Sequence, residues 1–149
     1  MSSGLPVFDT TLQETNLWLK EVESHLAQCE RQEAYAATRA VLHVLRDRLA
    51  PEAALNFAAQ LPLLLRGVFF EGWTLSNKPV RLRTVKAFSD AVRKRLPPRF
   101  RFDPVMATHA VMKAVITFNG RKQARKVFAQ LPPELAPLWP ETKAGIDLM

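Results

Sequence analysis

The sequence matches itself at a distance of 70 residues, and this internal repeat restricts the fold more than any other feature. Compared without gaps, residues 10–70 and 80–140 share 14 identities in 61 pairs. Unrelated sequences would match at roughly one pair in fifteen. The identities cluster at residues 37–41 against 107–111, and in the tetrapeptide Ala-Gln-Leu-Pro at 59–62 and 129–132. The chain therefore contains two tandem units of about 70 residues.

Apolar residues in the first part of each unit have helical spacing. Trp18, Val22 and Leu26 lie four residues apart and align with Phe88, Val92 and Leu96 of the second unit. Residues four apart lie on one face of a helix, so each unit is expected to begin with an amphipathic helix. Thr11 and Glu14 have the spacing of a capping box, which predicts that the first helix starts at Thr11 and ends near Gln28.

Helix-breaking residues divide the rest of the chain. A second helix is predicted over about 33–49, and Pro51 opens a third as a first-turn proline. Pro62 separates the third helix from a fourth. In the second unit the breaks are expected at Pro97-Pro98, Asn119-Gly120 and Pro132-Pro133. No segment shows sustained β alternation, so the predicted fold is an all-α helical bundle.

The two units are expected to form one domain. Neither unit of about 70 residues would bury much surface alone, so packing against each other with approximate twofold symmetry is predicted. The expected organisation over residues 1–149 is repeat one at about 10–73, a connection at 74–79, repeat two at about 80–140, and a C-terminal tail at 141–149. The tail is either frayed or a short docking peptide.

Four motifs occur in order along the chain: LRDRL at 45–49, AQLP at 59–62, RGVFFEGW at 66–73 and LPPELAPLWP at 131–140. Together they resemble a bacterial family of uncharacterised conserved proteins, classified as a domain of unknown function. The resemblance covers nearly the whole chain. It implies an all-helical fold and brings no established activity, substrate or catalytic residue. The second unit departs from the family's pattern by being basic between Lys78 and Lys126, so any function of that segment would belong to this member.

Composition indicates a folded cytoplasmic protein. The chain is 48% hydrophobic and 23% charged, which argues against general disorder. Its most apolar run, at 61–70, is too short for a membrane span and contains Arg66. The first residues lack the pattern of a signal peptide. Cys29 is the single cysteine, so we expect no internal disulfide, no metal site and no cofactor.

Charge is distributed unevenly between the two units. Residues 1–75 contain 6 Lys/Arg and 9 Asp/Glu, whereas residues 76–149 contain 15 and 5. In the second unit, Asp90 is the only acidic residue near nine cations between positions 78 and 101. We expect an exposed basic stripe on the first helix of this unit and a second basic cluster after Asn119-Gly120. The candidate anion or nucleic-acid contacts are Arg83, Lys86, Arg93, Lys94, Arg121, Lys122, Arg125 and Lys126.

The basic unit allows three interpretations. Residues 104–118, the Asn119-Gly120 turn and the following basic helix loosely resemble a helix-turn-helix that binds nucleic acid. The same helix pair recurs in the first unit without the charge, so the geometry alone does not indicate this function. The basic surface could instead meet the acidic half of another copy, or an acidic protein partner. The sequence leaves these alternatives open.

The sequence contains no motif that indicates catalysis. His25, His43 and His109 have no metal-binding spacing, and no glycine-rich phosphate loop or nucleophile elbow occurs. Cys29 is expected to be an inert, partly buried thiol. The aromatic residues Phe69, Phe70, Trp73 and Trp139 form either a docking patch or, as we expect, part of the core. The sequence thus predicts a non-enzymatic helical interaction module, with nucleic-acid binding as the alternative.

Overall fold

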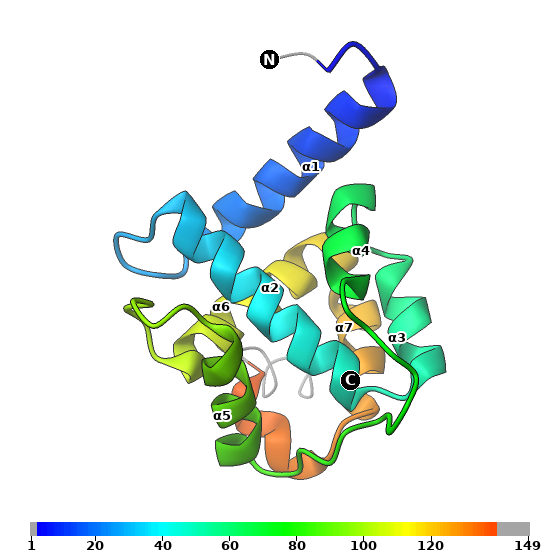
Figure 1. Cartoon of the computed structure of the whole chain (residues 1–149), viewed down its shortest axis with the longest axis vertical. Coiled ribbons are helices and arrows are strands. Elements are labelled where there is room, and N and C mark those ends of the chain that lie inside the picture. Colours follow the sequence, from blue (N-terminus) through cyan, green and yellow to red (C-terminus); the bar gives the residue numbers. More distant parts are fainter. Residues whose placement is uncertain (1–2, 140–149) are drawn as a thin grey trace.

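The computed structural model describes residues 3–139 and contains only helices in that range (Figure 1). The prediction of an all-α fold is confirmed. The predicted tail at 141–149 lies outside the described residues. In chain order the elements are α1 (Pro6–Glu23), α2 (Arg31–Arg48), α3 (Pro51–Ala58), α4 (Leu63–Phe70), α5 (Val85–Arg95), α6 (Pro104–Asn119), α7 (Arg121–Ala129) and the 3-10 helix η1 (Pro133–Leu138).

The helices follow one another in the same order in both units. α3 begins at Pro51 and α7 at Arg121, while α4 begins at Leu63 and η1 at Pro133, so both pairs are 70 residues apart. α1 packs on α6 and α5 packs on α2, so the first helix of each unit contacts the second helix of the other. A twofold arrangement would produce such reciprocal packing. The symmetry itself stays a prediction.

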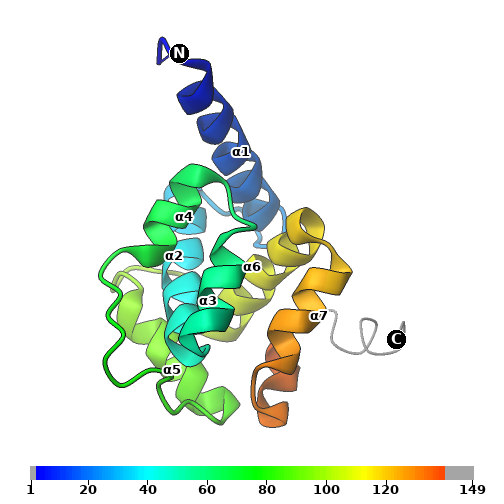
Figure 2. The same ribbon diagram turned by 90° about the vertical axis from the view of Figure 1, so that its right-hand side faces the viewer.

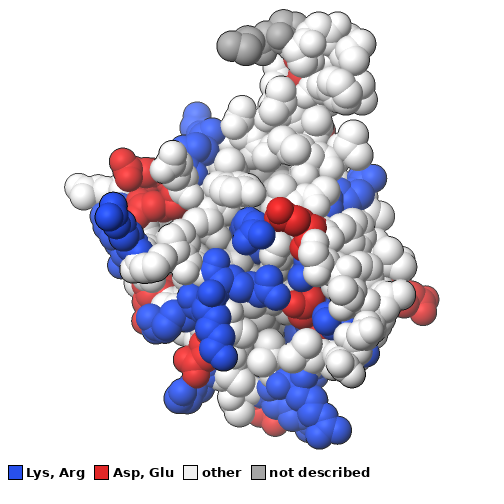
Figure 3. All heavy atoms as spheres, viewed as in Figure 1, with Lys and Arg blue, Asp and Glu red and all other residues white. Residues whose placement is uncertain are grey.

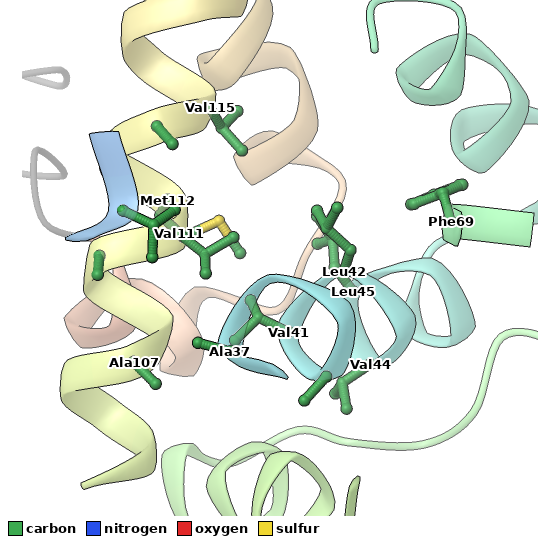
Figure 4. Packing of buried hydrophobic residues seen from close by; sticks show 14 of the residues in the cluster. Ala37, Val41, Leu42, Val44, Leu45, Phe69, Ala107, Val111, Met112 and Val115 are labelled. Carbon is green, nitrogen blue, oxygen red and sulfur yellow. The ribbon is translucent and has the colours of Figure 1, made fainter. Parts of the chain in front are cut away.

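The core is centred on α2 and α6, which pack against each other (Figure 4). Every residue from 40 to 47 in α2 is buried. In Figure 4, Ala37 and Val41 of α2 lie toward Ala107 and Val111 of α6. The small alanine side chains let two helices approach closely. These positions belong to the clusters that match between the repeats, so the repeated sequence forms the contact between the two units.

Two buried threonines at equivalent positions satisfy their hydroxyl groups within their own helices. Thr38 Oγ1 donates to the carbonyl oxygen of Ala34 at 2.8 Å. Thr108 Oγ1 donates to the carbonyl oxygen of Pro104 at 2.7 Å. Such bonds to the preceding helical turn allow a hydroxyl to be buried without an unpaired donor. Both threonines therefore fit the apolar interface between α2 and α6.

The predicted start of the first helix is wrong. α1 begins at Pro6, and Thr11 lies inside the helix. The Thr11 hydroxyl accepts a hydrogen bond from the backbone N–H of Leu64 at 2.8 Å, so it caps the first turn of α4 instead of its own helix. The capping box occurs at α2, where Glu30 is the N-cap and Glu33 the third helical residue. Proline, with a fixed φ and no N–H, starts α1.

The predicted breaks between helices are confirmed. Pro51 is the first residue of α3, and Pro62 is the N-cap of α4. Gly120 separates α6 from α7 with φ of 88°, a left-handed conformation that residues with a Cβ rarely adopt. Pro97 and Pro98 follow the end of α5, and Pro132 precedes η1.

The predicted connection at 74–79 lies within a longer non-helical stretch. This stretch runs over residues 71–84, between the end of α4 and the start of α5 at Val85. α2 holds this stretch in two places. The Val80 N–H donates to the Asp47 carbonyl oxygen at 2.8 Å, and Arg48 Nε donates to the Leu82 carbonyl oxygen at 3.1 Å. These long-range hydrogen bonds fix the chain where the sequence showed only a loop.

The aromatic residues belong to the core, as expected. Phe69 is buried and its ring centroid lies 5.4 Å from that of Phe57. Trp139 is buried and stacks on Phe128 at 4.8 Å. Phe70 and Trp73 are half-buried and pack against the same cluster. None of the helices within residues 3–139 combines the length and apolar character needed to cross a membrane.

Candidate interaction surfaces

The first predicted basic cluster is only partly on α5. Lys86, Arg93 and Lys94 lie on the helix, whereas Arg83 precedes its N-cap, so the placement of Arg83 on the helix is wrong. Lys86 Nζ lies 2.8 Å from Asp90 Oδ2. This hydrogen bond, together with the charges of Lys86, Arg93 and Lys94, holds the pKa of Asp90 below its ordinary value. Arg93 and Lys94 are exposed too, and no ion pair found within residues 3–139 includes them.

The second predicted basic cluster lies wholly on α7. Arg121, Lys122, Arg125 and Lys126 all belong to this helix, which packs on α6 after the Gly120 turn. Arg121, Lys122 and Lys126 are exposed. No ion pair found among residues 3–139 includes any of these three side chains. Their charge is therefore available to an external anion.

The two basic clusters do not form one surface. α5 packs on α2, α6 and η1, whereas α7 packs on α6. The ribbon views place α5 and α7 on different sides of the body (Figures 1 and 2). In the face shown in Figure 3, lysine and arginine side chains gather over the lower part of the molecule, with carboxylates among them.

Part of the basic charge is neutralised by the acidic first unit. Arg95 Nη2 lies 2.9 Å from Asp47 Oδ2. Arg101 forms two bonds of 2.7 Å to the carboxylate of Glu33. The bonds from Arg101, with one from the Glu30 backbone, lower the pKa of Glu33 to about 2. Opposite charges of the two units thus meet within one chain, which reduces the charge left for another copy.

A buried polar network on α2 was not foreseen. Arg46 is buried, and its Nη1 donates to the carbonyl oxygens of Phe69 and Glu71, both at 2.8 Å. Its Nε donates to Asp47 Oδ1 at 2.9 Å. His43 Nε2 lies 2.6 Å from the carbonyl oxygen of Val68. The last carbonyls of a helix lack partners within it, so α2 supplies the C-terminal cap of α4.

This network has the residue types of an active site, but its hydrogen-bonding groups face the protein. His43 Nε2 donates to Val68, which leaves Nδ1 as the acceptor for Arg95 Nη1 at 3.3 Å. Burial lowers the pKa of His43, and the charges of Arg46, Arg39 and Arg95 lower it further, against the Val68 hydrogen bond that raises it. The imidazole is therefore neutral with both nitrogens occupied. We assign the network a structural role.

The other candidate reactive groups have ordinary surroundings. Burial, then the Glu33 and Glu23 carboxylates, raise the pKa of the Cys29 thiol to about 11, so the unreactive thiol form prevails at neutral pH. His109 Nε2 bonds to the Pro137 carbonyl oxygen at 2.8 Å. His25 Nε2 lies 2.7 Å from Glu21 Oε2. Within residues 3–139, no three histidine, cysteine, aspartate or glutamate side chains are grouped to hold a metal ion.

A line of side chains along α1 and its two flanking turns, which we call the α1 seam, changes from exposed to buried along the chain. Its positions alternate by three and four residues, the spacing that brings side chains onto one seam, and they are Leu5, Phe8, Leu12, Thr15, Leu19, Val22 and Leu26. Leu19 and Val22 are 7% and 0% exposed on the core side, whereas Phe8 and Leu12 are 49% and 41% exposed. Both ribbon views show why: the first half of α1 projects beyond the body (Figures 1 and 2).

Exposed apolar residues of α4 extend this surface. Leu63 and Leu64 are 51% and 42% exposed, and the bond from Leu64 N–H to Thr11 Oγ1 holds the start of α4 beside α1. Figure 3 shows the projecting end of the molecule as mainly uncharged. We name this surface the apolar end and define it by Leu5, Val7, Phe8, Leu12, Leu63 and Leu64. Exposed apolar residues that gather in one place indicate an interaction site more than scattered ones do.

The comparisons with known proteins agree with the resemblance seen in the motifs. A family model described as Uncharacterized conserved protein (DUF2267) matches residues 15–138. The chain belongs to the DUF2267 family. A comparison with curated proteins gives no match. The DUF2267 match begins at Thr15, the first buried position of the α1 seam, so the exposed part of α1 precedes the matched region.

The motifs that indicated DUF2267 membership contact one another. Arg46 of LRDRL binds carbonyl oxygens within RGVFFEGW, as described above. Arg66 of RGVFFEGW donates through Nη2 to the carbonyl oxygen of Leu61, within AQLP, at 3.0 Å, and through Nε to that of Ala58 at 3.1 Å. The motifs therefore hold the ends of α3 and α4. The contacts between these motifs are structural, and none of them forms a catalytic group.

Sequence reasoning missed both the α2 network and the apolar end. The signal for the apolar end was present, because the alternating spacing of three and four continues back from Val22 to Leu5. Its exposure was not visible, since that depends on where the body ends. No sequence pattern indicated the network, because Arg46 and Asp47 meet most of their partners only when distant segments fold together.

Proposed function

We propose that the protein is a cytoplasmic, non-enzymatic helical interaction module that binds a partner protein through the apolar end. The observation that carries this proposal is the α1 seam, whose later positions are covered by the body while Leu5, Phe8 and Leu12 remain 51%, 49% and 41% exposed. An apolar seam is stabilised by a second apolar surface. The family match starts at Thr15, so Leu5, Phe8 and Leu12 precede the matched residues, whereas Leu63 and Leu64 lie within them.

The size of the apolar end sets a requirement on the partner. Its six side chains are 41–58% exposed. Since full burial of such a side chain contributes about 1.5–3 kcal/mol, the remaining burial is worth roughly 1 kcal/mol each. The total of about 6 kcal/mol is similar to the cost of association, about 4–15 kcal/mol. The partner must therefore contribute an apolar face of its own, as an amphipathic helix does.

The scaffold for this surface is a pair of repeats related by approximate twofold symmetry within one domain. The matching order of helices and the reciprocal packing of α1 on α6 and α5 on α2 support this arrangement. In an exactly repeated body the first helices of the two units would begin at equivalent positions. α1 instead begins at Pro6, well before Thr15, the counterpart of the first residue of α5, Val85. The projecting half of α1 is the part without a repeat counterpart.

Site-specific photo-crosslinking in the cells that make the protein tests the proposal. A photoreactive phenylalanine analogue replaces Phe8 in one variant and Leu75 in the other. Leu75 is an equally suitable control because it is 65% exposed and lies in the connection, away from the apolar end. We expect Phe8 to give a discrete protein adduct, and Leu12→Asp with Leu63→Asp to remove it. Equal labelling from both positions, or turnover of a metabolite by the purified protein, would reject the proposal.

A second candidate function is nucleic-acid binding through α7. It is favoured by the absence of ion pairs at Arg121, Lys122 and Lys126 among the described residues, in contrast to Lys86, Arg95 and Arg101. Each phosphate contacted by a cation releases counterions, so binding would weaken steeply with salt. The proposed contact is the α7 cluster, with Arg93 and Lys94 of α5 outside it.

Charge reversal distinguishes this candidate from general attraction to a basic protein. Labelled double-stranded and single-stranded DNA and RNA are titrated at two salt concentrations. If α7 is the contact, Arg121→Glu with Lys122→Glu abolishes binding while Arg93→Glu with Lys94→Glu, an equal change of charge, leaves it largely intact. Equal losses in both variants would indicate diffuse attraction. Circular dichroism confirms that both variants remain helical.

A further inference from the structure

Two neighbouring hollows lie where the two repeats meet. One, with a volume of about 300 Å³, lies between α3 and α7, which face each other in Figure 2. The other, of about 330 Å³, lies between α1, the end of α6 and the segment 60–62. Gln60 lines both hollows, and Phe118 of the second is next in sequence to Asn119 of the first. We name the two together the composite groove. Its size falls within the range of about 300–1,000 Å³ typical of ligand sites.

Carboxamide side chains dominate the polar lining between α3 and α7. They are Asn56, Gln60, Asn119, Gln123 and Gln130, and the one charged residue of this hollow is Lys126. A carboxamide carries both a hydrogen-bond donor and an acceptor. The peptide group carries the same pair of functions, one N–H and one C=O per residue. This lining therefore matches an extended backbone better than it matches a phosphate chain, which offers acceptors only.

Several polar atoms around the groove have no hydrogen-bond partner within the described part of the chain. Asn119 lacks a partner at both Oδ1 and Nδ2, and Trp18 lacks one at Nε1. Asn119 lines one hollow and Trp18, which is 1% exposed, lines the other. Thr15 Oγ1, one turn before Trp18, is also unpartnered. These atoms are themselves buried, and a buried polar group without a partner is costly, so a ligand toward which the Asn119 and Trp18 side chains turned to form hydrogen bonds would be stabilised.

The ends of the groove differ in charge and in apolar character. Glu14 lines the hollow beside α1, together with the stacked pair Trp18 and Phe118, whose centroids are 5.7 Å apart. Lys126 lines the hollow beside α7. The repeat counterpart of Lys126 is Asn56, which lines the same hollow from α3, so the positive charge is present on one side only. A segment with a basic residue at one end and an acidic residue at the other would complement this groove.

We propose that the composite groove binds an extended peptide segment of another protein. The carboxamides pair with its backbone, Lys126 receives an acidic side chain or a terminal carboxylate, and Glu14 receives a basic side chain. An apolar side chain between these ends packs on Leu17 and Phe118, which are 55% and 42% exposed in the hollow beside α1. The site shares no residue with the apolar end and does not depend on the function proposed for it. A lining with one lysine and one glutamate argues against a nucleic acid in this groove.

A random heptapeptide library displayed on phage, selected against the immobilised full-length protein, supplies the probes. Enriched sequences are synthesised with a fluorescent label and their affinity is measured by anisotropy. We expect Lys126→Glu to weaken binding about tenfold or more, the effect of losing a charge-assisted hydrogen bond. Lys122→Glu is the matched control, because Lys122 lies on the same helix and outside the groove lining. It should leave affinity within about twofold.

A nitrogen–proton correlation spectrum gives a second measurement that does not depend on substitution. The indole N–H of Trp18 and the side-chain amide of Asn119 should shift when a selected peptide is added. The indole N–H of Trp73 should not shift, because its nitrogen is also buried and unpartnered but the residue does not line either hollow. The proposal is overturned if no peptide is enriched, if enriched peptides bind both lysine variants equally, or if binding is lost only on Phe8→Asp. Equal competition by an oligonucleotide would also overturn it.

Discussion

Arg46 shows how single buried residues hold distant segments together. Its guanidinium lies in α2, and its hydrogen bonds end on the backbone that closes α4 and on Asp47, which in turn binds Arg95 of the second unit. A buried cation is tolerated when its hydrogen-bonding groups are satisfied, and it is costly when they are not. The same reasoning applies to His43, whose two ring nitrogens face Val68 and Arg95. The stability of this region therefore depends on every hydrogen-bonding group of the Arg46 and His43 network having a partner.

Replacing Arg46 should be strongly destabilising. Arg46→Met keeps the aliphatic part of the side chain but removes the Arg46 donors to the Phe69 and Glu71 carbonyl oxygens, and leaves Asp47 with Arg95 alone. The free energy of unfolding should fall by about 3–5 kcal/mol, the usual cost of removing one partner of a buried ion pair. Arg39→Met is the control, because Arg39 pairs with Glu71 at 3.0 Å on the surface, where a pair is worth about 0–1 kcal/mol. Urea titrations of both variants measure the difference.

His43 should make stability depend on pH. Its pKa in the folded protein is lowered, so the unfolded chain binds its proton more readily. The contribution of the neutral imidazole is therefore complete above the ordinary histidine pKa of about 6.5, and is lost as the pH falls from there toward the lowered pKa. His43→Gln should reduce this slope in urea titrations between about pH 7.5 and 5.5. An unchanged slope would contradict the burial of a neutral imidazole.

At the scale of elements, contacts between helices decide where helices are capped. α4 has only eight residues, which is too short to be stable alone. Thr11 of α1 binds its second N–H, while His43 and Arg46 of α2 bind its last carbonyls. Arg66, within α4, caps the end of α3 in turn. Both ends of α4 and the C-terminal end of α3 are therefore held by side chains from other helices.

Thr11 and Glu14 can be separated by substitution. Thr11→Val removes the acceptor of the Leu64 N–H and should cost about 1–2 kcal/mol, the range for loss of an N-terminal cap. Glu14→Ala should change stability by less than about 0.5 kcal/mol, as exposed helix positions do. A capping box at Thr11 and Glu14 would instead make both substitutions destabilising. Thermal denaturation followed by circular dichroism, with Thr10→Val as the exposed control, measures these effects.

At the scale of the whole molecule, the two repeats depend on each other. Their matched residues form the contact between α2 and α6, and ion pairs from Arg95 and Arg101 reach carboxylates of the first unit. Because α1 packs on α6 and α5 packs on α2, we expect that neither unit would keep its core without the other. The basic and acidic halves that composition separates are in contact in the folded chain.

Unfolding should therefore be a single cooperative transition. The helical signal in circular dichroism and the tryptophan fluorescence should follow the same urea curve, since Trp18 lies in the first unit and Trp139 in the second. Coincident curves are the test of two-state behaviour. Two separate transitions, one for each repeat, would contradict the prediction that the chain is one domain.

The sequence by itself determined the helical character, the repeat, the breaks at Pro51, Pro62 and Gly120, and the burial of the aromatic residues. These depend on local spacing and local conformational preference. The sequence also located the α7 cluster and most of the α5 cluster. Only the tertiary structure decided the partner of Thr11, the pairing of Arg95 and Arg101, the network of Arg46 and the exposure of Phe8. These depend on which distant segments meet, because a hydrogen bond, an ion pair or a covered face requires a neighbour that local spacing does not identify.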